Sequence, residues 1–192
     1  MNAPTKVAEL RTPRLILRDW RDSDLDAFAA MAEDPEVMEH LPPIADRMVS
    51  DGIAAWLRQN LAENGFGRWA VELPGEAGFI GLVGLVETGF EAHFTPAIEI
   101  GWRLARPYWG RGYAQEAAQA ALDFGFGEIG FHDIVAYTTP DNLRSLQLMA
   151  RLGMSHDPAD DFDHPDLPEG DKMRRLVLYR LSCESWAERR RR

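Results

Sequence analysis

The alternation of apolar and polar positions predicts short strands along most of the chain. Residues 15–20 alternate weakly, and residues 68–73 and 79–87 form two apolar runs joined by the turn sequence PGEAG. The second run is almost wholly apolar, which is typical of a central strand buried on both faces. The remaining strands are expected at 97–104, 134–139 and 174–181.

Apolar residues at helical spacing fill the segments between these strands. A helix is expected after Ser23 and before Pro35, and Ser50 is expected to cap a second helix that ends at Gly65. The helices predicted in the second half of the chain span 114–126 and 142–152, with Gly153 ending the latter.

The order of these elements predicts an α+β fold. One strand and two helices precede three strands, the last of which also begins a β-α-β-α-β run. This order indicates a single, mostly antiparallel sheet with helices on both faces. No repeat or long linker interrupts this order, so residues 1–192 are expected to form one domain. The final RRRR is expected to be part of a short, solvated basic tail.

Composition narrows the class of protein. The 192 residues are 45% hydrophobic and 27% charged, which is ordinary for a soluble globular chain. No apolar run reaches the roughly 18 residues that span a bilayer, and no signal peptide is recognisable at the N-terminus. One cysteine, Cys183, excludes an internal disulfide and fits a reducing, cytoplasmic compartment.

The net charge of -10 argues against a general nucleic-acid binder, which needs a basic face. It suits a cationic acceptor or a basic partner, and it equally suits simple solubility. Residues 102–115 are the exception, because they carry Arg103, Arg106 and Arg111 and no acid.

Two glycines in this basic segment, Gly110 and Gly112, precede a predicted helix. A helix start offers unpaired N–H groups and a partial positive charge, and glycine lets the backbone close around a phosphate. The segment therefore predicts an anion site, most simply for a pyrophosphate. The alternative is a plain glycine turn with surface arginines.

Common nucleotide motifs fit this segment poorly. The dinucleotide fingerprint needs a third glycine where Gln115 stands, and no Gly-Lys-Ser/Thr of a phosphate-loop NTPase occurs in the chain. A protein that binds NAD or another nucleotide stays a weaker alternative.

The basic segment resembles a known loop. WGRGYA (109–114) is similar to the acyl-CoA loop of the GNAT N-acetyltransferases, Gln/Arg-x-x-Gly-x-Gly/Ala. Gly112 and Ala114 match that signature, while Trp109 replaces the Gln or Arg. The longer form PYWGRGYAQEA resembles the RimJ/RimL branch, which acetylates the N-termini of ribosomal proteins.

Three further blocks extend the resemblance over residues 9–181. NLRSLQLMARLGM (142–154) resembles the Asn-x-x-Ser element of the RimJ/RimL branch, with Met154 in place of Phe. IEIGWRL (98–104) is similar to the family's fourth strand, and RTPRLILRDWRDSDLDAF (11–28) to its first strand and helix.

The resemblance implies a splayed sheet that holds acetyl-CoA, without a metal, between the family's fourth and fifth strands. The backbone of Trp102, Arg103 and Leu104 would pair with the pantetheine, and Asn142 would bond the same arm. The pyrophosphate would lie in a cradle formed by Gly110, Arg111, Gly112, Tyr113 and Ala114.

Direct acetyl transfer needs a neutral amine, a stabilised carbonyl oxygen and a proton for the departing thiolate. At pH 7 a lysine amine is about 0.04% neutral, whereas an α-amine is about 14% neutral. An N-terminal α-amine therefore needs less help from a base. The acceptor is expected to be a protein N-terminus or a small amine.

Glu99 is the candidate base, because it occupies the family's Glu position on the fourth strand. Ser145 is the candidate acid, because it matches the Ser of the RimJ/RimL element and Met149 replaces the family's usual Tyr. The structural alternatives are a strand carboxylate paired with an arginine for Glu99, and hydrogen bonding at a helix start for Ser145.

An acidic loop at 155–171 carries seven acids and two histidines. Their spacing matches no known metal site, and a flexible solvated loop is the simplest expectation. The alternative is an acceptor rim that includes Phe162, Asp163 and His164, with His164 as a second candidate base. His93, in the turn before residue 97, is either a surface residue or an acceptor contact.

Two functional classes follow from these motifs. The first is an N-acetyltransferase, favoured because Glu99 and Ser145 supply an acid–base pair. The second is a non-catalytic acyl-CoA sensor with the same cradle. A homodimer is a family-level expectation only.

Overall fold

The computed structural model describes residues 7–191, and they fall into two units. The first unit holds the described residues up to 85 together with 101–121, and the second holds 86–100 and 122–191. The chain passes between the units within β4 (Ala77–Glu87), β5 (Ile98–Leu104) and α3 (Tyr113–Phe124). That residues 1–192 form one domain stays a prediction.

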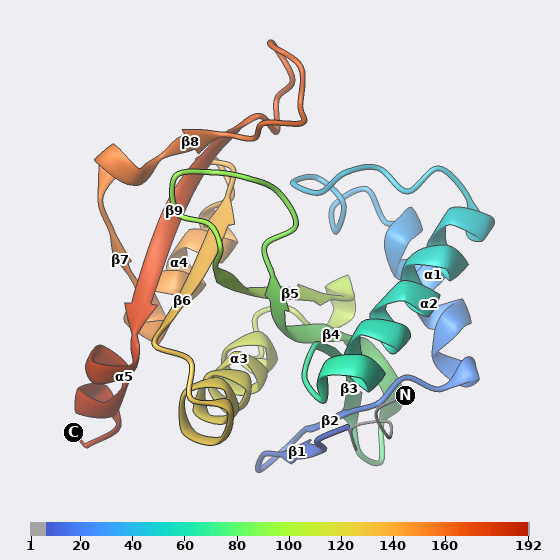
Figure 1. Cartoon of the computed structure of the whole chain (residues 1–192). Helices are drawn as coiled ribbons and strands as arrows, with labels where there is room; N and C mark the ends of the chain where they lie inside the picture. Colours follow the sequence, from blue (N-terminus) through green and yellow to red (C-terminus); the bar gives the residue numbers. More distant parts are fainter. Residues whose placement is uncertain (1–6, 192) are drawn as a thin grey trace. The chain divides into compact units, whose positions relative to one another are not determined.

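The first unit is built on an antiparallel ladder. Its strands run in the order β1, β2, β3, β4, with Leu17 opposite Val71 and Trp69 opposite Val83. The helices α1 and α2 lie side by side in this unit (Figure 1). The other elements of the first unit are β1 (Leu10–Arg11), β2 (Ile16–Arg18), η1 (Asp22–Asp24), α1 (Leu25–Glu33), α2 (Arg47–Asn64), β3 (Arg68–Leu73) and η2 (Arg106–Tyr108).

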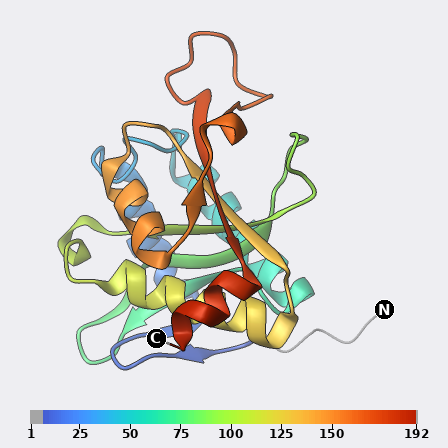
Figure 2. The ribbon, with the colours of Figure 1, turned by 90° about the vertical axis from the view of Figure 1, so that its left-hand side faces the viewer.

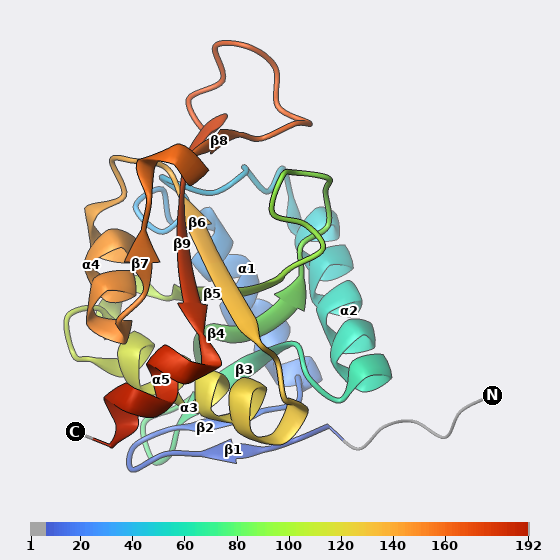
Figure 3. The same cartoon turned by 60° about the vertical axis from the view of Figure 1, so that its left-hand side comes forward.

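The second unit is organised around β6 (Asp133–Thr138) and β9 (Arg175–Ser182), which pair antiparallel along six residues of each strand. They run side by side in Figures 2 and 3. One parallel pairing joins β5 to β6, at Ile98–Ile134 and Glu99–Val135. The remaining elements are η3 (Gly125–Ile129), α4 (Leu143–Leu152), β7 (Ser155–His156), η4 (Pro158–Asp160), β8 (Phe162–Asp163) and α5 (Cys183–Arg190).

The predicted α+β fold with a mostly antiparallel sheet is confirmed by these pairings. The apolar run expected to be a central strand is β4, whose residues from Phe79 to Val86 are all buried. Three helix ends also follow the prediction. Gly65 and Gly153 end α2 and α4 with positive φ angles of 75° and 83°, and α1 ends before Pro35.

Two expected helix boundaries were wrong. The cap of α2 is Asp46, whose side chain accepts a hydrogen bond from the Val49 amide at 2.9 Å, while Ser50 lies inside the helix. The helix predicted to end at 126 ends instead at Phe124 and continues as a π-helical turn that closes at Gly130.

The expected C-terminal tail is mostly the helix α5; Arg189, Arg190 and Arg191 are exposed, as predicted, and the last arginine of the RRRR run lies outside the described residues. Ser182 caps this helix, and its Trp186 side chain is 4% exposed. The Trp186 indole N–H donates to Asp123 Oδ1 at 2.9 Å, which anchors α5 to the end of α3 within the second unit. An apolar anchor in a basic segment explains why composition alone predicted a tail.

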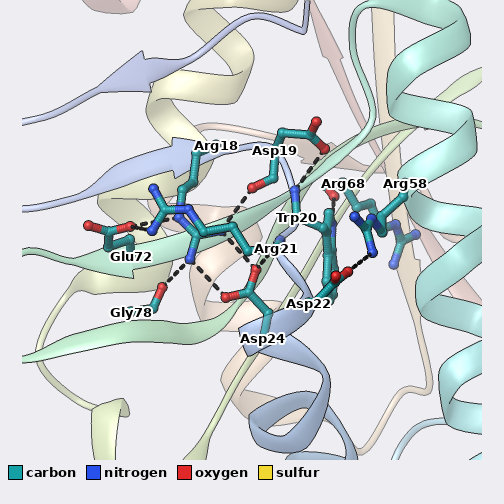
Figure 4. A network of polar contacts seen from close by, with 10 residues as sticks. All are labelled: Arg18, Asp19, Trp20, Arg21, Asp22, Asp24, Arg58, Arg68, Glu72 and Gly78. Atoms are coloured by element: carbon teal, nitrogen blue, oxygen red, sulfur yellow. Dashed lines mark hydrogen bonds and ion pairs between the residues drawn. The ribbon is translucent and has the colours of Figure 1, made fainter.

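A buried ion-pair network holds the start of α1 to the sheet of the first unit (Figure 4). Arg18 is 3% exposed, and its guanidinium contacts Asp24 at 2.8 Å and Glu72 at 2.6 Å. It also donates to the Gly78 carbonyl. Asp24 further accepts from the Arg21 amide at 2.7 Å. Because every charged group here has partners, the cost of burying Arg18 is offset.

Removing the buried carboxylate should destabilise the protein strongly. In Asp24→Ala, Arg18 stays buried with a lost partner, so we expect the free energy of unfolding to fall by about 3 kcal/mol or more. The matched control is Asp22→Ala, since Asp22 forms an exposed pair with Arg58 and should contribute under about 1 kcal/mol. Urea denaturation measures both, and equal small losses would contradict this role of the network.

The same network makes stability depend on pH. The hydrogen bond from Arg18 lowers the pKa of Glu72 despite partial burial, and Arg21 lowers it further. A carboxyl with a lowered folded-state pKa stabilises the fold above its ordinary value of about 4.5, and this contribution is lost as the pH falls through the folded-state pKa. As the pH falls from about 6 to about 2, we therefore expect the unfolding free energy of Glu72→Gln to decrease less than that of the wild type. Glu128→Gln, an exposed change, should keep the wild-type slope; parallel profiles for all three proteins would refute the assignment.

Candidate functional site

The basic segment folds into a tight turn at the start of α3. Gly110 and Gly112 have φ angles of 71° and 80°, a conformation that other residues rarely adopt. A Cβ at Gly110 would meet nothing within 4 Å, so there is open space beside the turn. The Glu116 amide donates to the Gly112 carbonyl at 3.0 Å, so the helical hydrogen bonds begin directly after the glycines. The first N–H groups of α3 are thus in the position suited to bind an anion.

A clamp from the N-terminal segment holds this turn, and the sequence analysis missed it. Glu116 accepts from the Thr12 hydroxyl at 2.6 Å, and from the amide and Nε of Arg14 at 2.9 and 2.6 Å. Arg14 Nη1 also donates to the Arg111 carbonyl at 3.0 Å. The Arg14 guanidinium lies 4.6 Å from the centre of the Tyr113 ring. Arg14 therefore adds a cation beside Arg111.

The clamp favours the charged form of Glu116. Partial burial acts to raise the pKa of this carboxyl, but the hydrogen bonds from Thr12 and Arg14 outweigh it and lower the pKa. Glu116 is the first acid after residues 102–115, and no role was predicted for it. Its partners lie about 100 residues away along the chain, so no local pattern could have indicated the clamp.

The C-terminal half of β5 is fixed against its neighbours in the first unit. The Ala105 amide donates to the Ile80 carbonyl at 2.9 Å, and the Trp109 indole donates to the Leu104 carbonyl at 2.7 Å. A Cβ at Gly81 would approach the Arg103 carbonyl to 2.2 Å, so the close packing of β4 on β5 requires glycine there. Trp102, Arg103 and Leu104 thus belong to the same unit as the glycine turn.

The candidate acid and the predicted pantetheine ligand lie together in the second unit. Asn142 caps α4, since its Oδ1 accepts from the Ser145 amide at 3.3 Å and its Nδ2 donates to Thr138 Oγ1 at 2.8 Å. The backbone amide of Ser145 thus forms a hydrogen bond at the helix start, which is the structural alternative named for this residue. The roles of the Asn142 amide and the Ser145 hydroxyl toward acetyl-CoA stay predictions.

Glu99 is a buried acid, 9% exposed, in the N-terminal half of β5. Its register partner on β6 is Val135. Val135 belongs to an apolar cluster with Phe94, Phe162 and two leucines of β9. The candidate base therefore lies on a strand that borders this cluster.

Both candidate acceptor histidines lie against aromatic rings of this cluster or of residues packed on it. The His93 ring is 6.4 Å from that of Phe162, and the His164 ring is 4.3 Å from that of Phe90. Phe162 is only 7% exposed, so it supports the cluster from within. His93 Nε2 also lies 3.4 Å from Asp160 Oδ1.

The acidic loop is more ordered than the solvated loop expected from its composition. It contains β7, η4 and β8, and both short strands pair with β9. Asp163 contacts Arg174 and Arg175 at 3.4 Å each, while His156 bonds Asp161 at 2.8 Å. Several of its carboxylates are thus paired within the second unit. In the described part of the chain, no three His, Cys, Asp or Glu side chains gather to hold a metal.

Loosening the clamp should weaken anion binding at the glycine turn. In Glu116→Gln the ion pair with Arg14 is lost, so Arg14 and the Arg111 carbonyl are less firmly held. We expect the Kd for acetyl-CoA to rise about tenfold, measured by calorimetry. Glu128→Gln, in the turn after α3, is the control and should bind as the wild type does. An unchanged Kd in Glu116→Gln would show that the clamp does not contribute to acetyl-CoA binding.

Comparisons with known proteins agree with this architecture. Residues 14–155 match the model of the acetyltransferase (GNAT) domain. The chain is 34% identical over 157 residues to the uncharacterized protein YkkB of Bacillus subtilis, covering 81% of this chain and 88% of that one. It is 29% identical over 177 residues to the uncharacterized N-acetyltransferase YnaD of the same organism, covering 92% and 98%.

A solved structure shows the same fold. The GNAT-family acetyltransferase of Bacillus anthracis superposes with a TM-score of 0.76 at 26% identity, over 92% of this chain and 99% of that chain. None of the described helices is both long and apolar enough to cross a membrane. The glycine turn at the start of α3 lies within the matched residues 14–155. Because the family model covers most of the chain, the chain belongs to the GNAT acetyltransferases, which are acyl-CoA-dependent acyltransferases.

Proposed function

We propose that this protein moves an acetyl group from acetyl-CoA to a primary amine, either a protein N-terminal α-amine or a small amine. The transfer is direct, within a ternary complex, as the resemblance to the GNAT N-acetyltransferases implies. The observation that carries the proposal is the turn at Gly110 and Gly112, which includes Arg111, has open space beside Gly110 and is held by Arg14.

The turn has the chemistry that a pyrophosphate requires. Two positive-φ glycines leave the backbone N–H groups accessible, and the start of α3 adds its partial positive charge. Arg111 supplies a positive charge within the turn, and Arg14 adds a cation beside it whose charge is shared with Glu116. Gly110, Arg111, Gly112, Tyr113 and Ala114 are proposed to hold the pyrophosphate, and Trp102, Arg103, Leu104 and Asn142 the pantetheine.

Acetyl transfer then needs two proton movements. Glu99 is proposed to accept the proton of the attacking amine, directly or through a water, and its burial keeps its charge away from bulk solvent. Ser145 is proposed to donate a proton to the departing thiolate of CoA. His164, packed on Phe90, is the alternative base.

The acceptor side is proposed to involve the second unit. His93, Phe162, Asp163 and His164 are the proposed acceptor contacts, with Phe162 shaping the cluster from within. One domain of residues 1–192, a cytoplasmic location and a homodimer complete the proposal. A non-catalytic acyl-CoA sensor is the second candidate, and the same glycine turn supports it equally.

The roles of the two proton carriers are separable by kinetics. We expect Glu99→Gln to lower kcat by about 10²- to 10⁴-fold and Ser145→Ala to lower it by a smaller factor, because each removes one proton transfer. Release of the CoA thiol from acetyl-CoA is followed with peptides bearing free N-termini, small amines and amino acids as acceptors. Asp166→Asn, in the exposed loop, is the control for the change of a carboxylate to an amide.

The outcomes separate the candidates. Binding of acetyl-CoA should stay within about twofold of the wild type in both variants, since neither change touches the glycine turn. A wild-type kcat in Glu99→Gln together with a loss in His164→Ala would transfer the role of base to His164. Tight binding of acetyl-CoA without turnover on any acceptor would favour the sensor.

A further inference from the structure

The Arg103 side chain carries two buried polar atoms that have no hydrogen-bond partner among the described residues. Its Nε and Nη1 atoms are buried and have no hydrogen-bond partner. Within the described residues only four side-chain atoms share this state, and the other two are hydroxyl oxygens of Ser50 and Thr88. Arg103 is therefore the one charged group among them.

Arg18 shows what a buried arginine in this unit normally requires. That guanidinium is satisfied by Asp24, Glu72 and the Gly78 carbonyl. Burying a charge without such partners is costly, so native proteins rarely retain one unless a ligand or function compensates. Arg103 has no equivalent set of partners, which indicates that its counter-ion is supplied from outside the chain.

The known neighbours of Arg103 in the first unit do not offer a negative charge. The guanidinium lies 5.8 Å from the centre of the Phe28 ring, and Phe28 is fully buried. Burial, with a smaller contribution from repulsion by Arg68, lowers the pKa of Arg103 to about 10. Arg68 itself packs over Gly101, where a Cβ would meet its guanidinium at 2.8 Å. A second cation, Arg68, thus lies close enough to repel Arg103, and the Phe28 ring lies beside the Arg103 guanidinium.

Burial of Arg103 is incomplete. Arg103 as a whole is partly exposed, although its Nε and Nη1 atoms are buried. Its position on β5 is also informative, because Glu99, Gly101 and Arg103 occupy alternate positions of that strand, and alternate positions share a face. The proposed base, Glu99, and Arg103 are therefore carried by the same strand, each two positions from Gly101.

We propose that Arg103 binds an anionic group on the acceptor amine, so that the acceptor is an amino acid or another amine bearing a carboxylate or phosphate, and not a polyamine. This inference rests on the proposed acetyl transfer. The phosphates of CoA are not the expected counter-ion, since the glycine turn has its own cations in Arg14 and Arg111. The pantetheine contacts proposed for residues 102–104 use backbone atoms, which leaves the Arg103 side chain for the acceptor.

The test compares acceptors that differ only in the anion. Glycine is paired with glycinamide, another free amino acid with its amide, and O-phosphoethanolamine with ethanolamine, so carboxylate and phosphate are distinguished. We expect the wild type to have the higher kcat/KM for the anionic member of at least one pair. In Arg103→Met that kcat/KM should fall about 10- to 100-fold, while values for neutral members and the Kd for acetyl-CoA stay within about twofold.

Two variants guard against a trivial loss of structure. Arg103→Lys keeps the charge and should retain part of the preference for the anionic member. Arg58→Met changes an arginine of α2 that pairs with the exposed Asp22, and it should leave the preference unchanged. Thermal unfolding of each variant verifies that the fold is intact, and an unfolded Arg103→Met is replaced in the comparison by Arg103→Lys.

Three results would overturn the inference. One is a wild-type preference for spermidine or for the neutral members. Another is an equal loss for both members of each pair in Arg103→Met. The third is a weakened affinity for acetyl-CoA in that variant, which would assign Arg103 to CoA.

A complete lack of turnover would instead contradict the proposed function, and binding then decides the inference. N-acetylglycine and its amide are titrated by calorimetry into the protein saturated with CoA. Binding of the acid alone, lost in Arg103→Met, would support an anion site. Equal binding of acid and amide, or no binding of the acid, would overturn it.

Discussion

The ion pair between Arg14 and Glu116 fixes the geometry on which the proposed cofactor site depends. A loop containing two positive-φ glycines has many accessible conformations, and its backbone N–H groups bind an anion only when their directions are fixed. The carboxylate of Glu116 ties the first turn of α3 to residues 12–14, and Arg14 returns a hydrogen bond to the Arg111 carbonyl. The ion pair thus holds the turn rigid and also places the Arg14 guanidinium beside it.

Two arginines of the first unit illustrate how the chain treats buried charge. Arg18 is enclosed by acceptors of its own chain and has a structural role at the start of α1. Arg103 is placed over Phe28 and near Arg68, with two buried nitrogen atoms that no residue of the described chain satisfies. The contrast separates a charge kept for stability from one proposed to be kept for a ligand, so the chain's own residues constrain the chemistry of the acceptor.

The parts of the fold that were predictable are those with a local signal. Helix ends at Gly65 and Gly153, the apolar strand β4 and the glycine turn each follow from a few adjacent residues. The caps and anchors were harder, because Asp46 competes with Ser50 for the same role and only the packing of α2 selects between them. Helix α5 was missed because one buried residue, Trp186, outweighs its basic composition.

The site was predictable only in its local pieces. The basic segment and the Asn142–Ser145 element could be recognised from short motifs, whereas the Thr12–Arg14–Glu116 clamp joins residues about 100 positions apart. The sequence also marked Arg103 as a cation but could not show that it is buried without a partner. Such facts depend on which side chains meet across strands, and no periodicity encodes them.

The most direct test of the account is to follow the acetyl group itself. The protein is mixed with isotopically labelled acetyl-CoA and an amine acceptor in a single turnover, and both protein and acceptor are weighed by mass spectrometry. The account predicts label on the acceptor amine and none on the protein at any time. Label on the protein, or release of free acetate with an unmodified acceptor, would contradict direct transfer to an amine.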